Sequence, residues 1–383
     1  MSKEKTKIKK DLKEIATVFF KLGCFAFGGP AAHIAMMEDE VVTKRQWMTR
    51  DYFLDLIGTT NLIPGPNSTE MTMHCGYERA GKTGLFVAGV CFIFPAIIIT
   101  GILAYLYVEY GQLPEVEPFI FGIKPAVLAI IASAILKLGK KAVKGWELAV
   151  IGILVFMASI LGVNEIIALL SAGILGMCYF YFRSRSSTDI KSIAPFFLFS
   201  GGLFSTILKV STANVFWTFL KVGAVLYGSG YVLFAYLDTE LVSRGWLTRP
   251  ELIDAIAVGQ FTPGPVLSTA TFIGYQLTGI WGALAATTGV FLPSFLFVLI
   301  LNPFIPRMRQ SKILRYFLDS VNIAAVAVML AVLYVMTKDT LTDWKAILIA
   351  VICAYLTFGT KLSVIWIVIL GAIFGFLLSF IVL

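Results

Sequence analysis

Two Pro-Gly-Pro triplets stand at corresponding places in the two halves of the chain, each followed by short polar side chains. The triplets are Pro64-Gly65-Pro66 and Pro263-Gly264-Pro265, and the polar residues after them are Asn67, Ser68, Thr69, Ser268 and Thr269. Proline suits the first position of a helix, where an N–H has no partner within the helix. Free N–H groups, a positive dipole end and nearby hydroxyls favour an anion. The triplets therefore predict two half-helices whose N-termini bind an anion, with a plain turn between two spans as the alternative reading.

An earlier triplet, Gly28-Gly29-Pro30, interrupts an apolar run in the same manner. Helices tolerate glycine and proline poorly in their interior, so we expect broken or re-entrant helices around residues 18–36 and 53–80. Kinked spanning helices or interfacial amphipathic helices are the alternative. The second half has Gly228-Ser229-Gly230 at the matching place, so the two half-sites are not expected to be fully symmetric.

Two lysines lie inside apolar runs at corresponding positions of the two halves, Lys21 in TVFFKLGCFAF and Lys221 in VFWTFLKVGAVLY. A lysine within a membrane segment is costly and is by default a functional candidate, here as a positive charge for a bound anion. Snorkelling of the amine to the membrane surface is the alternative, especially for Lys21, which is close to a basic N-terminus. Lys124 has no cationic counterpart and is a weaker candidate.

Carboxylates also flank the Pro-Gly-Pro breaks. Asp55 and Asp254 precede the two breaks and Glu70 follows the first. Such groups can relay protons, or they can form structural ion pairs with the lysines and with Arg50 and Arg249. The charged segments around Glu40 and Glu240, next to Trp47 and Trp246, read as solvated loops anchored at the membrane surface.

The elements that must position these residues are membrane helices. Of the 383 residues, 58% are hydrophobic and 14% are charged, and the mean hydropathy is +0.85, which leaves too little polar surface for a soluble globule of this size. The net charge of +8 comes from short basic clusters between apolar runs, as in membrane-flanking loops, so nucleic acid is not an expected partner. The expected spans are residues 85–108, 121–138, 147–162, 164–182, 193–208, 279–306, 317–337, 344–360 and 362–383.

The chain repeats itself at a shift of about 200 residues, which indicates a duplicated domain. We expect a basic cytoplasmic N-terminus (1–17), a first repeat (18–190), a linking span (191–214) and a second repeat (215–383). Lys and Arg gather on the cytoplasmic side, which places the end of the span at 85–108 outside and the end of its counterpart at 279–306 inside. The predicted fold is an all-α multi-pass bundle of two inverted-topology repeats with broken helices.

Residues for an enzyme reaction are missing from the pattern. The two histidines, His33 and His74, form no local metal motif, and neither H-E-x-x-H nor G-x-S-x-G occurs. The five cysteines are scattered singly. We therefore expect no enzymatic activity, no metal and no cofactor.

Three segments closely resemble the signatures of the chromate ion transporter family in its long two-domain form. They are FGGPAAHIAMMEDEVV, NLIPGPNSTE followed by GYERAG, and GQFTPGPVLSTATFIGY, and the resemblance covers the chain from about residue 18. It implies a multi-pass protein of the prokaryotic cytoplasmic membrane that exports chromate and so confers resistance. It also implies importance for the Gly-Gly-Pro and Pro-Gly-Pro residues.

Residue types alone cannot separate chromate from sulfate, because both are tetrahedral dianions of similar size. The alternative function is therefore a carrier of sulfate or another oxyanion, with proton coupling through Asp55 or Asp254 as one form of it. The expected partners are the oxyanion and the lipid bilayer, with a homodimer as an alternative to a single chain.

Overall fold

The computed structural model describes residues 2–26, 30–60, 63–111, 113–183, 210–227, 230–302, 311–360 and 362–381, and every regular element in these ranges is helical. The first half of the molecule contains α1 (Ser2–Phe25), α2 (Pro30–Glu38), the π-helix η1 (Asp39–Lys44), α3 (Arg50–Thr60), α4 (Asn67–Tyr110), α5 (Glu117–Ala142), α6 (Trp146–Ile160) and α7 (Glu165–Arg183). The all-α prediction is confirmed for these residues.

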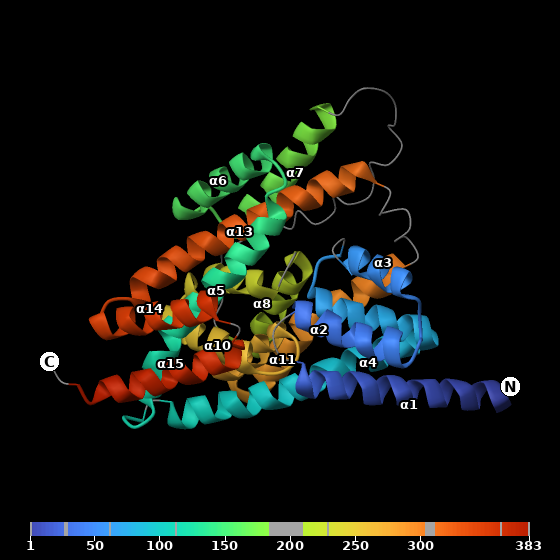
Figure 1. Ribbon diagram of the computed structural model, residues 1–383, viewed down its shortest axis with the longest axis horizontal. Helices are drawn as coiled ribbons and strands as arrows, with labels where there is room; N and C mark the ends of the chain where they lie inside the picture. The colour runs from blue at the N-terminus through green and yellow to red at the C-terminus, as the bar shows by residue number, and fades with distance from the viewer. Residues whose placement is uncertain are drawn as a thin grey trace.

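The second half repeats this order of elements. It contains α8 (Thr212–Val225), η2 (Gly230–Val232), α9 (Leu233–Leu237), the π-helix η3 (Asp238–Val242), α10 (Arg249–Phe261), η4 (Val266–Ser268), α11 (Thr269–Leu301), α13 (Lys312–Thr340), α14 (Trp344–Gly359) and α15 (Val364–Ser379). Figure 1 shows helices of the two halves interspersed rather than in two separate bodies, with the two termini at opposite ends of the molecule.

Several helices are long and apolar enough to cross a membrane. They are α4, α5, α7, α13 and the segment Val266–Leu301 that holds η4 and α11. Three further apolar helices, α6, α14 and α15, have only 15 or 16 residues, fewer than the roughly 20 that a perpendicular span needs. The multi-pass prediction is confirmed, although these three helices are shorter than we expected. The predicted span at 193–208 lies outside the described residues.

The longest helices, α4 and α11, are hairpins rather than straight rods. Each has a short arm (residues 67–79 in α4, 269–277 in α11) that folds back on a long arm (residues 82–110 and 280–301) at a glycine with positive φ: Gly81 (φ 62°, ψ −150°) and Gly279 (φ 64°, ψ −151°). This backbone region is essentially restricted to glycine. In α11, Thr271 Oγ1 lies 2.7 Å from Thr287 Oγ1, which a continuous helix would hold about 24 Å away. The predicted breaks at Gly-Gly-Pro and Pro-Gly-Pro fall between α1 and α2 and between α3 and α4, whereas the turns at Gly81 and Gly279 were not predicted.

Close glycine contacts hold each hairpin shut. A Cβ atom on Gly76 would overlap the carbonyl oxygen of Gly84, and one on Gly274 would overlap the carbonyl oxygen of Gly282. Only glycine lets the two backbones approach this closely. The N-terminal end of each short arm, directly after a Pro-Gly-Pro triplet, is thereby buried inside the protein.

The two halves exchange their C-terminal helices. In the first half α5 packs on α14 and α15 of the second, and in the second half α13 packs on α6 and α7 of the first. The N-terminal parts are built alike, since α1 crosses α4 as α8 crosses α11. Each half therefore completes the other.

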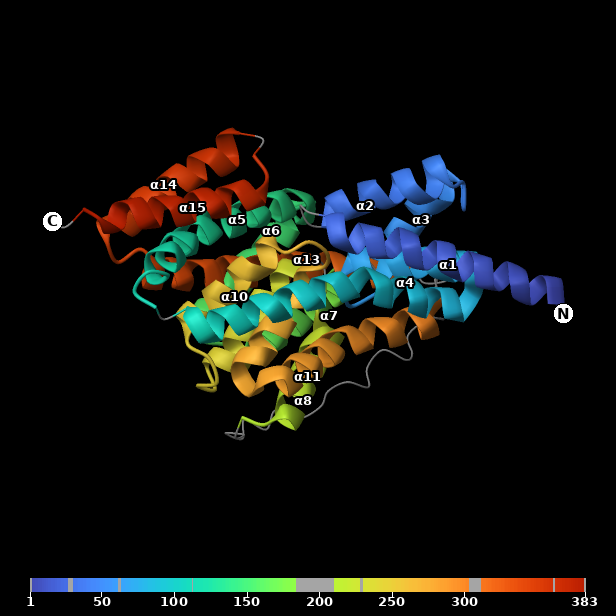
Figure 2. The same cartoon turned by 90° about the horizontal axis from the view of Figure 1, so that it is seen from below.

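The long arms of α4 and α11 run in opposite senses side by side (Figures 1 and 2). Phe86, near the start of one arm, stacks on Phe295, near the end of the other. The inverted orientation of the two halves across a bilayer remains a prediction, and the linking segment 191–214 is described only from residue 210.

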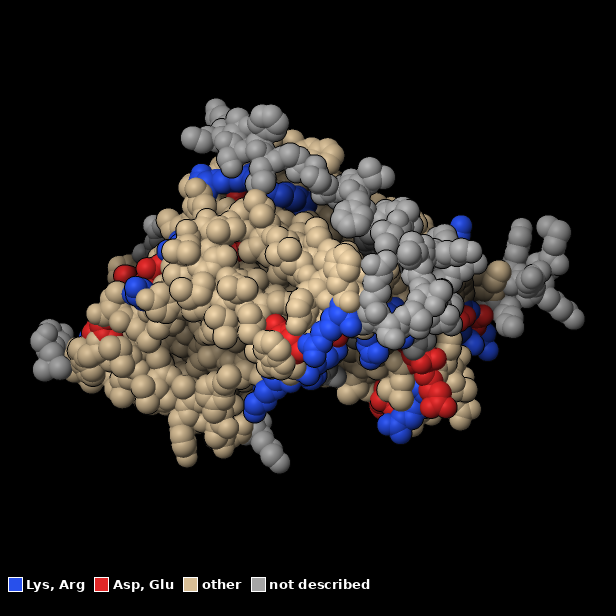
Figure 3. All heavy atoms as spheres, turned by 90° about the horizontal axis from the view of Figure 1, so that it is seen from above, with Lys and Arg blue, Asp and Glu red and all other residues tan. Residues whose placement is uncertain are grey.

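The outer surface suits a lipid environment. Figure 3 shows a broad uncharged face with lysine, arginine and carboxylate side chains gathered in separate groups at its edges. Large apolar side chains are exposed along the long arm of α4 and along α14, among them Phe94, Ile102, Val351 and Tyr355. Apolar surface of this extent is typical of a protein whose surroundings are hydrocarbon.

We predict that Gly76→Ala destabilises the protein by about 1–3 kcal/mol, because the added methyl group must push the two arms of α4 apart. Gly101→Ala is the matched control, since a Cβ there meets nothing within 4 Å and alanine favours the helix. Thermal unfolding in detergent micelles measures both. Equal melting temperatures for Gly76→Ala and Gly101→Ala would show that the hairpin contact is unimportant.

Inverted topology predicts opposite sidedness for two equivalent loops. Single cysteines at Glu115, after α4, and at Lys312, after α11, are expected to react with a membrane-impermeant maleimide from opposite sides of the membrane. The parent chain, with its five native cysteines, gives the background labelling. Labelling of both positions from the same side would exclude the inverted arrangement.

Candidate functional site

The two Pro-Gly-Pro triplets are buried, and each is held by the opposite half of the molecule. The backbone N–H of Gly65 donates to the carbonyl oxygen of Leu226, directly after α8, at 2.6 Å. The N–H of Gly264 donates to the carbonyl oxygen of Ala26, directly after α1, at 3.0 Å. Proline has no N–H, so glycine carries the only donor of each triplet, and a buried donor must find an acceptor.

The first triplet leads directly into the short arm of α4. Pro66 precedes its first residue, and the N–H groups of Thr69 and Glu70 both donate to the Pro66 carbonyl oxygen, at 2.8 and 3.0 Å. Ser68, Thr69 and Glu70 are buried. The predicted buried half-helix N-terminus is therefore present, with its dipole pointing at the triplet.

The surroundings of Gly65 are polar. Glu70 Oε1 and Ser294 Oγ, the latter from the long arm of α11, lie beside Gly65 so closely that a Cβ atom there would overlap both. Gly65 has φ 143°, which also favours glycine. The hydroxyl of Thr69, both carboxyl oxygens of Glu70 and the hydroxyl of Ser294 are buried without a hydrogen-bond partner in the described part of the chain. Unsatisfied buried polar atoms of this kind are rare and indicate a site for a ligand or for water.

The second triplet has an equivalent but less polar environment. Gly264 (φ 89°) lies against Ala96 of α4, and Pro265 precedes the short turn η4. The Ser268 hydroxyl is buried without a partner among the described residues, whereas the Thr269 hydroxyl donates to the Val266 carbonyl oxygen at 2.8 Å. The two triplets therefore form two related but unequal half-sites.

The Gly-Gly-Pro region contributes a different contact. Gly28 and Gly29 lie outside the described residues, and Pro30 is the first residue of α2. One turn later His33 is buried, and its Nε2 lies 3.1 Å from the Ala26 carbonyl oxygen that also accepts from Gly264. This segment therefore helps to position the acceptor of the second triplet.

The two lysines do not point into the triplets. Lys21 is exposed on α1. Lys221 is likewise exposed on α8 and pairs with Glu240 of η3, which Arg244 also contacts. Their role in anion binding stays a prediction.

The flanking acidic and basic residues have other partners than those we expected. Asp254 is buried on α10, accepts from the Tyr107 hydroxyl at 2.7 Å and lies 3.4 Å from Lys124 Nζ, both from the first half. Arg249 pairs with Asp238 and Asp339, and the exposed Arg50 pairs with Glu38.

Three further placements complete this group. Asp55, the counterpart of Asp254, is exposed on α3. The expectation that Glu40 and Glu240 lie in solvated loops is wrong, because both are buried in π-helices and paired with basic residues four positions later, Lys44 and Arg244.

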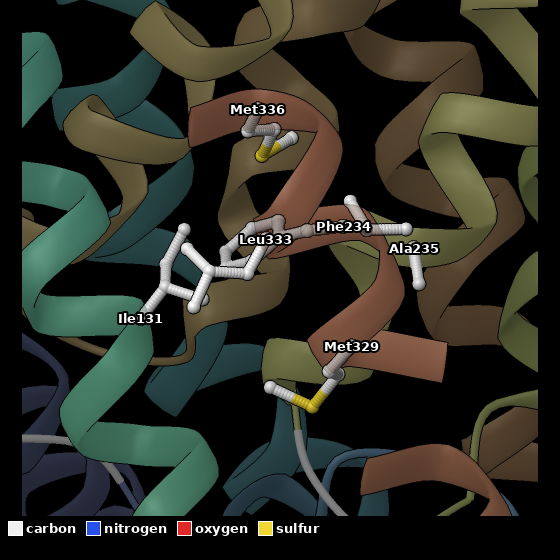
Figure 4. Close-up of a pocket in the computed structure, with 7 residues that line it drawn as sticks. Ile131, Phe234, Ala235, Met329, Leu333 and Met336 are labelled. Carbon is white, nitrogen blue, oxygen red and sulfur yellow. The ribbon is translucent and has the colours of Figure 1, made fainter. Parts of the chain in front are cut away.

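Two hollows in the molecule lie away from the triplets. A cavity of about 10 Å³ between α5, α9 and α13 is lined by Ile131, Phe234, Ala235 and residues of α13 (Figure 4). A groove of about 470 Å³ between α6 and α7 is lined mainly by apolar side chains. Neither offers the polar groups that a dianion requires.

Sequence reasoning missed part of the polar group around Gly65. Glu70 carried a signal, since it follows the Pro-Gly-Pro triplet within one turn of a helix. Ser294 carried almost none, because a single polar residue in an apolar span is common and Gly65, beside which it lies, belongs to the other half. The same holds for Tyr107, whose partner Asp254 comes from the second half.

Comparison with known proteins gives a consistent answer. The family model for "Chromate transporter" matches residues 13–177 and 213–376. The chain is 30% identical over 358 residues to the chromate transport protein of Cupriavidus metallidurans. The aligned residues make up 91% of this chain and 88% of that protein. It is 28% identical over 374 residues to the probable chromate transport protein of Synechococcus elongatus, and the aligned residues make up 95% of each of the two proteins.

A third relative extends the match to another bacterium. The chromate transport protein of Pseudomonas aeruginosa is 29% identical over 378 residues, covering 94% of this chain and 90% of that protein. No solved structure matches. The family model covers well over half of the residues, in two stretches that each hold one Pro-Gly-Pro triplet, and the chain therefore belongs to the chromate transporter family.

Proposed function

We propose that this chain is a secondary transporter that exports chromate across the cytoplasmic membrane of a prokaryote and thereby confers chromate resistance. The observation that carries the proposal is the pair of buried half-helices whose Pro-Gly-Pro triplets are each hydrogen-bonded to the opposite half. A half-helix N-terminus inside a membrane protein is a suitable place for an oxyanion, since it offers donors and a positive dipole end without a full counter-charge. The named relatives supply the identity of the anion.

The hydrogen bond of each triplet to the opposite half suggests how the site could open alternately to the two sides of the membrane. Because each triplet is anchored to the opposite half, a rotation of one half against the other changes both half-sites together. The anion is then held near Gly65, Thr69 and Ser294 in one half-site, and near Gly264 and Ser268 in the other. Asp254, whose bonds to Tyr107 and Lys124 join the halves, is placed to follow this movement.

Export requires no further energy source than the membrane potential. Moving one charge across about 100 mV is worth roughly 2.3 kcal/mol, so a dianion leaving a negative cytoplasm gains roughly 4 to 5 kcal/mol. Uptake of the same dianion would instead need several co-transported cations.

Everted vesicles or proteoliposomes with radiolabelled chromate test the direction and the driving force. An imposed potential that is positive on the side corresponding to the cell exterior is expected to drive chromate to that side, and collapse of the potential should stop the flux. An excess of unlabelled sulfate measures selectivity. Flux that needs a pH gradient and disappears with sulfate would instead identify a proton-coupled carrier of general oxyanions.

A pair of variants separates two roles for Lys221. We expect Lys221→Ala to abolish chromate flux while the protein still folds, because the positive charge attracts the dianion. Glu240 is the buried partner of Lys221, so the double variant Lys221→Ala/Glu240→Gln removes the charge of both. Restored flux in the double variant would show that Lys221 only neutralises Glu240, and continued loss would support a direct role.

A further inference from the structure

Glu70 is a buried carboxyl group that the proposed transport cycle leaves without a role. Its side chain is 0% exposed, and neither carboxyl oxygen has a hydrogen-bond partner in the described ranges. It lies in the first turn of the short arm of α4, where the positive end of the half-helix dipole is strongest. Within the described part of the chain Glu70 forms no ion pair, in contrast to Glu40 and Glu240.

The groups that surround the Glu70 carboxyl come from both halves. Glu70 Oε1 lies beside Gly65 in the triplet, and Ser294 Oγ of α11 lies beside the same glycine. Two other titratable side chains are close in the structure or the chain: Tyr227, which interacts electrostatically with Glu70 and directly follows Leu226, the acceptor of the Gly65 N–H, and the buried His74, one turn later on the same short arm. The Thr69 hydroxyl, also without a described partner, precedes Glu70 in the chain. Three polar side chains without a described partner, Thr69, Glu70 and Ser294, thus gather at the first triplet, where the absence of a side chain on Gly65 lets Glu70 and Ser294 approach its backbone.

The charge of Glu70 decides whether an anion can enter this place. An ionised carboxylate would be buried without a cation, and it would occupy the position at the helix N-terminus that an external anion needs. A divalent oxyanion beside it would be repelled at short range and low dielectric. A protonated Glu70 carries no charge, and its O–H can donate a hydrogen bond to an oxygen of the anion.

We infer that Glu70 is the proton-binding residue of the oxyanion site, so that its carboxyl group must be protonated before a divalent oxyanion binds at the first triplet. This inference rests on the proposed transport function: it makes oxyanion binding depend on pH, while the membrane potential still drives export. At a pH where Glu70 is ionised in the empty site, one proton passes from water to a Glu70 oxygen before the dianion binds, and it returns to water after the dianion leaves. The loaded site then carries one negative charge fewer than it would with ionised Glu70.

The second half-site has no equivalent carboxyl group. The residues at the matching position after the second triplet are Ser268 and Thr269, whose hydroxyls do not ionise in the physiological range. One protein therefore binds one proton per anion at these half-sites, and the two half-sites respond differently to pH.

The test is chromate binding to the purified full-length chain in detergent, measured by equilibrium dialysis across a series of alkaline pH values. Free chromate is the unprotonated dianion in this range, so a change in affinity reports the protein. We expect the dissociation constant of the wild type to rise about tenfold per pH unit once Glu70 ionises, with one proton taken up per chromate bound, as a pH indicator in weak buffer records. Glu70→Gln should bind chromate with no pH dependence and no proton uptake.

Two further variants make the outcome decisive. Glu70→Asp keeps an ionisable carboxyl and should keep the pH dependence, whereas Asp254→Asn removes the other buried carboxyl near the interface of the halves and should leave the slope unchanged. Size-exclusion chromatography confirms that each variant is folded. The inference would be overturned if the dissociation constant of chromate depended on pH in Glu70→Gln as it does in the wild type. It would also be overturned if that pH dependence disappeared in Asp254→Asn.

The failure of the inference differs from the failure of the proposed function. Chromate binding by the wild type without any pH dependence leaves the transporter proposal intact and excludes the role of Glu70. The absence of chromate binding by the wild type at every pH would contradict the proposed function itself.

Discussion

A reciprocal pair of backbone hydrogen bonds holds the centre of this molecule. In a Pro-Gly-Pro sequence the glycine N–H is the only donor, and burial of that donor in a membrane protein requires an acceptor. Gly65 finds it at Leu226 and Gly264 finds it at Ala26, each in the opposite half. The positions of both half-helices, and with them the dipoles directed at the centre, depend on these two bonds. The first helix of each half must end at a defined residue to present the carbonyl oxygen.

The two halves are also joined by the packing of their C-terminal helices. Since α5 packs on α14 and α15 while α13 packs on α6 and α7, neither half buries its own apolar faces completely. The hairpins of α4 and α11 then bring a short polar arm alongside a long apolar one, held by glycine contacts such as Gly76 on Gly84. Apolar packing thereby places backbone N–H groups where a simple bundle of straight spans would have none.

The two halves have diverged where charge is concerned. Asp254 is buried and bound by Tyr107 and Lys124, whereas its counterpart Asp55 is exposed on α3. Glu70 follows the first triplet, and hydroxyl residues follow the second. A symmetric pair of sites would bind the same ion in the same way in both half-sites. Under the proposed mechanism, one half-site binds a proton and the other acts through neutral donors alone.

Much of this fold could be predicted from local sequence. The length and apolarity of the spans, the internal repeat, and the breaks at Pro30, Pro66 and Pro265 depend on composition, glycine and proline, whose effects are local. The contact partners of the charged and polar residues cannot be predicted from local sequence in the same way. Arg249 contacts Asp238 and Asp339 rather than Asp254, and Lys221 contacts Glu240, because these pairings depend on how the helices of the second half pack. The Gly65 N–H reaches across to Leu226, which depends on how the two halves interlock. Composition and local pattern therefore predict a two-part membrane protein with buried half-helices. Which charged and polar groups meet depends on the folded structure, since a buried group bonds to whatever the packing of the apolar faces brings within reach.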